Sequence, residues 1–138
     1  MKRTLMLGLL LGAFFCGSPV LAVDLVGEWG NIVSEDHHGA LSGAPDHELR
    51  PVGNHFVTRD LLWTLKITSR EGNGFHGQWC SLKKCEQLVG VVRKDGSMLM
   101  VDEDSTFFAT MYGDEMELCV TEPGEAFRLA ACLIMKKK

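Results

Sequence analysis

The sequence lacks the signatures of the commonest catalytic sites. It contains no Gly-x-Ser-x-Gly nucleophile turn, no His-Glu-x-x-His metal helix and no glycine-rich phosphate loop. No two cysteines have the Cys-x-x-Cys spacing, which argues against a zinc site made of four thiolates. These absences argue against an enzyme and favour a protein that acts by binding.

Positive charge is also scarce, because 14 lysines and arginines face 18 aspartates and glutamates, for a net charge of −4. Nucleic-acid-binding proteins normally present a basic surface, so we expect no nucleic-acid partner. The 138 residues are enough for one domain, and 46% of them are hydrophobic, which is typical of a globular chain.

Residues 1–22 are predicted to be a helical signal peptide. Lys2 and Arg3 precede an apolar run over residues 5–16, and small residues at positions −3 and −1 of the site fit cleavage after Ala22. The apolar run is shorter than the ~20 residues of a membrane span. We therefore expect a single periplasmic or secreted domain over residues 23–138, with no membrane span after cleavage.

Alternating apolar and polar residues predict eight strands and no helix after the signal peptide. The strands cover residues 25–33, 59–70, 75–82, 85–94, 97–102, 106–112, 116–121 and 126–135. Tight turns, such as Asp95 and Gly96, connect most of them in order. Closure removes exposed sheet edges, so we predict an all-β, eight-stranded antiparallel up-and-down (meander) barrel, with a two-sheet sandwich as the alternative.

Residues 34–58, rich in glycine, proline and polar side chains, are predicted to be a long lid-like loop between the first two strands. The up-and-down order places this loop at the same end as residues 81–84, 103–105 and 122–125. The mouths of small barrels are common ligand sites, so we expect any site at this end.

Cleavage after Ala22 leaves four cysteines, which allow three disulfide pairings. Cys80 and Cys85 flank one short loop, and Cys119 and Cys132 lie on neighbouring predicted strands. This geometry favours the Cys80–Cys85 and Cys119–Cys132 pairs, and strand alternation places Cys119 and Cys132 on the outer face.

The first strand contains Gly27, Glu28 and Trp29. This start resembles the Gly-x-Trp motif of lipocalins and the wider calycin group, which are ligand-binding barrels. The resemblance implies structural roles for Gly27 and Trp29, and a basic residue of the last strand over the tryptophan, namely Lys136 or a neighbouring lysine. Later stretches, including Phe75–Gly77 and Asp95–Gly96, are similar to small secreted bacterial proteins of uncharacterised function.

The sequence predicts a binding module whose open end holds a small apolar molecule or a protein partner. The candidate ligand-binding residues are Trp63, Phe56, Phe108 and Phe127. An alternative is an inhibitor of a host or competitor enzyme, because an acidic chain suits a basic target.

A second alternative is binding of a transition metal, zinc or copper, by the histidines of residues 34–58. The candidate ligands are His37, His38, His47 and His55. A solvated polar loop would have the same composition. The acidic run of Asp102, Glu103 and Asp104 is typical either of a solvated turn or of a calcium or carbohydrate site.

Overall fold

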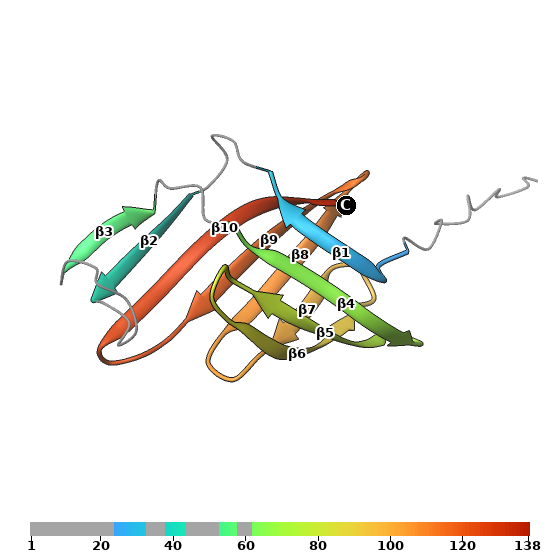
Figure 1. The fold of residues 1–138 in the computed structure, drawn as a ribbon, viewed down its shortest axis with the longest axis horizontal. Helices are drawn as coiled ribbons and strands as arrows, with labels where there is room; N and C mark the ends of the chain where they lie inside the picture. The colour runs from blue at the N-terminus through green and yellow to red at the C-terminus, as the bar shows by residue number, and fades with distance from the viewer. Residues whose placement is uncertain (1–23, 33–37, 44–52, 58–61) are drawn as a thin grey trace, which may run out of the picture.

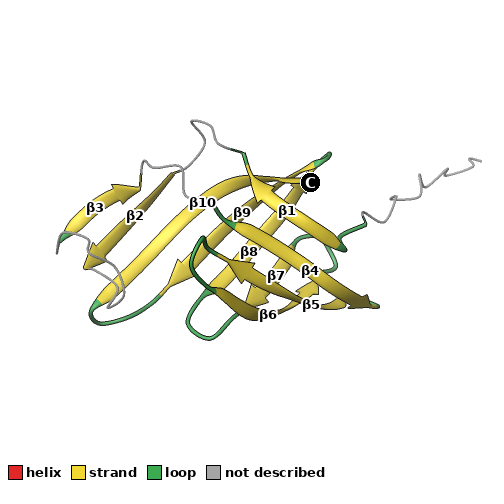
Figure 2. Ribbon diagram, in the orientation of Figure 1, coloured by secondary structure: helices red, strands yellow, loops and turns green. Residues whose placement is uncertain are grey.

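The structure is a computed structural model, and it describes residues 24–32, 38–43, 53–57 and 62–138. The regular elements in these ranges are all β-strands (Figure 2). They are β1 (Gly27–Asn31), β2 (His38–Gly43), β3 (Asn54–Val57), β4 (Thr64–Glu71), β5 (Gly74–Cys80), β6 (Cys85–Val92), β7 (Met98–Val101), β8 (Thr106–Tyr112), β9 (Glu115–Glu122) and β10 (Phe127–Lys137). The predicted signal peptide lies outside the described residues, among which no helix is long and apolar enough to cross a membrane.

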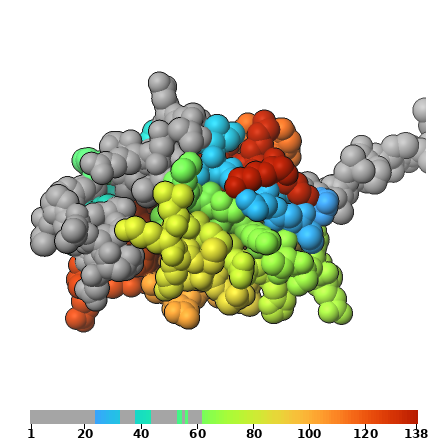
Figure 3. Space-filling view, viewed as in Figure 1, coloured from blue at the N-terminus to red at the C-terminus, as the bar shows by residue number. Residues whose placement is uncertain are grey.

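Eight of the strands close into a barrel. Strands β4 to β10 pair in order and antiparallel, and β1 pairs with β4 on one side and with β10 on the other. The closing seam joins Trp29 to Lys137 and Asn31 to Met135, and Figure 3 shows β1 (blue) against the C-terminal residues (red). The predicted eight-stranded antiparallel barrel with meander order is confirmed.

The alternating strand directions sort the connections between the two ends of the barrel. Tight turns join β4 to β5, β6 to β7 and β8 to β9 at one end, where Gly72, Gly96 and Gly113 adopt the positive φ angles that favour glycine. We call this the closed end. The connections after β5, β7 and β9 lie at the opposite end, on the left of Figure 1, which we call the open end.

The interior of the barrel is filled by alternate side chains of its strands. The largest fully buried side chains are Trp29, Phe107, Leu65, Ile67, Leu88, Met98, Met100, Met116, Leu118 and Met135. All of them belong to one contiguous cluster, which also includes Trp79. The interior of the barrel is therefore occupied by the protein's own side chains.

Two strands lie within residues 34–58, where the sequence predicted a loop. β2 pairs with the N-terminal half of β10, and β3 pairs with β2 to form a hairpin (Figure 1). The close approach requires glycine at position 39, where a Cβ atom would lie 2.6 Å from that of Ala131. The loop prediction was wrong for these residues because pairing with β10, far along the chain, outweighs their weak local strand propensity.

Both predicted disulfides are present on neighbouring strands. Cys80 and Cys85 join β5 to β6, with a Cα–Cα distance of 4.0 Å, and Cys119 and Cys132 join β9 to β10 at 3.9 Å. Disulfides persist in oxidising compartments. The two bonds therefore point to an oxidising extracytoplasmic environment.

Removing the longer disulfide is expected to cost more stability than removing the shorter one. The Cys119–Cys132 bond spans 13 residues and the Cys80–Cys85 bond spans five, and a longer closed loop restricts the unfolded chain more. We expect the double variant Cys119→Ser/Cys132→Ser to lose about 2–3 kcal/mol of unfolding free energy. Urea denaturation of both double variants measures this, and an equal or larger loss from Cys80→Ser/Cys85→Ser would contradict it.

The closed end is organised around Trp29. Its ring nitrogen donates a hydrogen bond to the carbonyl oxygen of Leu25 at 3.0 Å, and the Lys137 ammonium lies 5.9 Å from the ring centroid. Lys137 also bonds the carboxylate of Asp24 at 3.0 Å. A lysine of the last strand thus covers the Gly-x-Trp tryptophan, in a barrel consistent with a lipocalin-like one.

Gly27 is required beside this lysine. Its φ angle is 137°, and a Cβ atom at this position would lie 2.7 Å from Cε of Lys137. A side chain at position 27 would therefore strain the backbone and displace the lysine that covers Trp29.

Candidate binding site at the open end of the barrel

Three aromatic rings form a row on the inner face near the open end. Trp63, directly before β4, is half-buried and stacks on Trp79 of β5, with ring centroids 4.9 Å apart and an interplanar angle of 11°. Phe107 of β8 contacts Trp79 with centroids 5.2 Å apart. The backbone N–H of Trp63 donates to Oδ1 of Asn31 at 2.7 Å, which holds this segment against β1.

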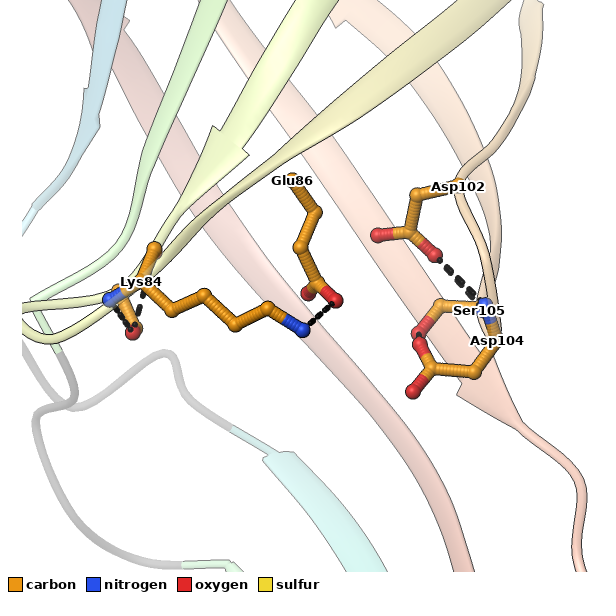
Figure 4. A network of polar contacts seen from close by, with 6 residues as sticks. Lys84, Glu86, Asp102, Asp104 and Ser105 are labelled. Atoms are coloured by element: carbon orange, nitrogen blue, oxygen red, sulfur yellow. Dashed lines mark hydrogen bonds and ion pairs between the residues drawn. The ribbon is translucent and has the colours of Figure 1, made fainter. Parts of the chain in front are cut away.

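A carboxylate lies next to this aromatic row. Glu86 of β6 is directly opposite Trp79 in the β5–β6 register, and it shares the inner face with Leu88, two residues on. The Lys84 ammonium donates a hydrogen bond of 2.6 Å to Oε1 of Glu86 (Figure 4). This bond raises the pKa of Lys84, which keeps its ammonium group charged. The open end therefore already holds one ammonium group on an inward carboxylate.

Asp102 brings a second carboxylate to the same place. Asp102 comes directly after β7 and continues the inward alternation of Met98 and Met100. Its Oδ1 accepts hydrogen bonds from the backbone N–H groups of Ser105 and Asp104. Its other oxygen, Oδ2, is buried without a hydrogen-bond partner among the described residues. Burial is the main cause that raises the pKa of Asp102, and the nearby Glu86 and Asp104 raise it further.

Glu86, Asp102 and Asp104 each place one oxygen within 4.8 Å of the others, with Glu86 and Asp102 facing each other in Figure 4. In the part of the chain that the structure describes, this is the group with the spacing to hold a metal ion. Acidic groups that are partly open to solvent, as Asp104 is here, are common without an ion, and Lys84 already supplies positive charge at this place. We therefore describe the group as the acidic side of the open end.

The raised pKa of Asp102 predicts how stability depends on pH. The ionised carboxylate costs folding free energy above its folded-state pKa, and that cost disappears as the pH falls through this pKa. Asp102→Asn keeps an oxygen that accepts the two N–H groups but removes the charge. We expect this variant to be more stable than the wild type at pH 7, and the difference to vanish below about pH 3.5.

Asp95 is the control, because its pKa is shifted in the opposite direction to that of Asp102. Its hydrogen bonds with Ser97 lower the pKa of its carboxyl. Asp95→Asn is expected to be less stable than the wild type at pH 7. Thermal unfolding between pH 3 and pH 8 measures both variants. A loss of stability at neutral pH in Asp102→Asn would contradict the buried, partly unsatisfied carboxylate.

The structure separates the four predicted ligand-binding aromatic residues. Trp63 lies on the inner face in the aromatic row, and Phe127 begins β10 at the same end, half-buried. Phe56 is 84% exposed on β3. Phe108 is on the outer face, opposite Cys119, and its neighbour Phe107 is the one that faces inward. Phe108 therefore does not share the inner face with Trp63, and ligand binding by Phe108 stays a prediction.

Two of the four predicted metal ligands lie outside the described residues. His37 and His47 lie there, and the structure says nothing of them. His38 is exposed at the start of β2, where it pairs with Cys132, and His55 is opposite Leu41 in the β2–β3 register. Zinc or copper binding by these histidines stays a prediction.

Sequence patterns alone did not identify Glu86, Lys84 and Trp79 as residues of this site. A signal for Glu86 was present, because pairing Cys80 with Cys85 places Trp79 opposite Glu86 on the other face of the hairpin. No protein family, curated protein or solved structure gives a significant match to the chain. The class of molecule is therefore defined by its fold, a closed eight-stranded antiparallel β-barrel with two cross-strand disulfides.

Proposed function

We propose that the protein is an exported binding module that holds a ligand, or a group of a protein partner, at the open end of its barrel. The half-buried ring of Trp63, stacked on Trp79 beside the inward carboxylate of Glu86, carries this proposal. Ligand sites characteristically combine apolar surface with a few placed polar groups. The predicted signal peptide and the two disulfides support a periplasmic or secreted location.

The chemistry of this end favours a ligand that combines an apolar or aromatic body with a positive charge. Aromatic faces attract cations, and a carboxylate forms short, strong hydrogen bonds with ammonium and guanidinium groups. Lys84 illustrates this preference, since its ammonium already bonds Glu86. A lysine or arginine side chain of a target enzyme has the same chemistry as such a ligand. If the partner is a protein, we therefore propose that the barrel inhibits an enzyme by binding such a side chain.

Benzylamine, which is cationic at neutral pH, is a suitable probe, and benzyl alcohol is its neutral counterpart of the same size. We expect benzylamine to quench tryptophan fluorescence saturably and benzyl alcohol to bind at least about tenfold more weakly, because it lacks the charge. Glu86→Gln and Trp63→Ala should each weaken benzylamine binding by about tenfold or more. Lowering the pH should also weaken benzylamine binding. The pKa of Asp102 is raised, so its negative charge is lost at a higher pH than that of an ordinary aspartate.

Glu71→Gln is the matched control, because Glu71 is an exposed carboxylate at the closed end. It should leave the affinity for benzylamine unchanged. Equal affinity for the amine and the alcohol, or equal losses from Glu71→Gln and Glu86→Gln, would contradict a cation-selective site at the open end.

A further inference from the structure

A second surface, on the outside of the barrel, carries a contiguous group of apolar side chains. Val89 and Val91 of β6, Val101 of β7 and Phe108 of β8 are between 41% and 49% exposed, and Leu99 of β7 lies among them. The strand registers place Val89 opposite Val101, and Leu99 opposite both Val91 and Phe108. We call these five residues the outer patch. Contiguous exposed apolar surface of this kind is typical of protein interfaces.

The outer patch is uncharged, but its two ends are not. The alternate outward positions of β6, β7 and β8 hold Gln87, Val89, Val91, Leu99, Val101, Thr106, Phe108, Thr110 and Tyr112. At the closed end of β7, the turn after β6 contains Arg93 and Lys94 with one acid, Asp95. At the open end, β7 is followed by Asp102, Glu103 and Asp104. Along β7 itself, charge therefore reverses sign from Lys94 before the strand to Glu103 after it. Of the neighbouring charges at these two ends, Lys84 is paired with Glu86 and Asp114 with Lys136.

We propose that a second copy of this chain docks on the outer patch, with the β7 strands of the two copies antiparallel and related by a twofold axis perpendicular to them. The two apolar patches then face each other across an isologous interface. Glu103 of each copy faces Lys94 of the other, so the interface contains this attractive pair twice. A parallel arrangement would instead place acid on acid, at the cost of repulsion.

This pattern of charge selects a second copy over other occupants. A basic protein fits the acidic end and is repelled at the Arg93–Lys94 end, and an acidic protein or an anionic lipid surface has the reverse conflict. Only a partner whose charge also reverses along the contact satisfies both ends. Because the outer patch is confined to three short strands, we expect the dimer to be reversible and to depend on concentration and salt.

Sedimentation equilibrium of the purified protein with both disulfides intact tests the dimer. Leu99→Lys, at the centre of the patch, is expected to raise the dimer dissociation constant at least about tenfold, because it buries a charge. Phe56→Lys is the matched control, since Phe56 is 84% exposed on β3, which the sheet order separates from the patch by β9, β10 and β2, and it should leave the constant unchanged. Val101→Thr, nearly isosteric, should weaken the dimer while leaving the thermal midpoint within a few degrees.

Charge exchange tests the antiparallel orientation. Lys94→Glu and Glu103→Lys should each weaken the dimer, because each creates two like-charge contacts. The double variant restores both attractive pairs at the net charge of the wild type, so its dissociation constant should return to within about twofold of the original value. A monomer at all concentrations, a dimer insensitive to Leu99→Lys, or a double variant weaker than both single ones would overturn the proposal.

Discussion

Replacing Phe107 with alanine is expected to lower the free energy of unfolding by about 3–5 kcal/mol, whereas replacing its neighbour Phe108 is expected to lower it by less than about 1 kcal/mol. The two residues are adjacent on β8, but Phe107 is 0% exposed and Phe108 is 49% exposed. The alanine at position 107 leaves a cavity against Trp79, whose ring lies 5.2 Å away. Phe108 makes its contacts on the outer face, opposite Cys119 and Leu99.

Urea denaturation of the two variants measures this difference, provided that the unfolding free energy falls with urea concentration at the same slope in both. The pair is internally controlled, because both variants lose the same atoms from the same strand. A larger loss from Phe108→Ala than from Phe107→Ala would show that β8 has the opposite face inward. The pairing of Cys119 with Cys132 would then also have to change face.

The second large effect is expected at Trp29. Its side chain is 2% exposed, its ring nitrogen bonds the carbonyl of Leu25, and the Lys137 ammonium lies over the ring. Trp29→Ala removes the bulk of the closed end and leaves that carbonyl without its donor, so we expect a loss of about 3–5 kcal/mol. Differential scanning calorimetry should show a correspondingly large fall of the unfolding midpoint.

Two milder variants divide this effect between packing and charge. Trp29→Phe keeps a ring but loses the hydrogen bond, and Lys137→Met keeps the alkyl chain but loses the ammonium group. Each is expected to cost about 1 kcal/mol, well below the loss from Trp29→Ala. A loss of less than 1 kcal/mol from Trp29→Ala would mean that the closing seam between β1 and β10 does not depend on this residue.

Much of the barrel was predictable from local pattern. Trp63, Leu65 and Ile67 alternate with polar residues, and the structure places Leu65 and Ile67 on the inner side of β4 with Trp63 packed against the same core directly before the strand. The Asp95–Gly96 turn predicted the β6–β7 hairpin, and Cys119 and Cys132 face each other as strand neighbours. These features depend on periodicity and short-range turns, which the sequence contains directly.

Features that depend on distant contacts were harder to predict. The β2–β3 hairpin forms on the edge that β10 offers beyond its three pairs with β1, and nothing local to residues 38–57 indicates that edge. Which of Phe107 and Phe108 faces inward depends on the β8–β9 register, which the turn at Gly113 sets. That register pairs Phe108 with Cys119, whose side chain faces outward. Glu86 was missed because a charged residue is usually assigned to the outside of a strand, although its register with Trp79 places it inside.

The claim that the open end is the binding surface is tested most directly by nuclear magnetic resonance. Backbone amide and indole shifts of the isotope-labelled protein are recorded while benzylamine is added. We expect saturable shifts at Trp63, Glu86, Asp104 and Ser105, with no change at the closed-end turns of Gly72, Gly96 and Gly113. Shifts confined to the closed end or to the outer patch, with the four open-end residues unmoved, would contradict the account.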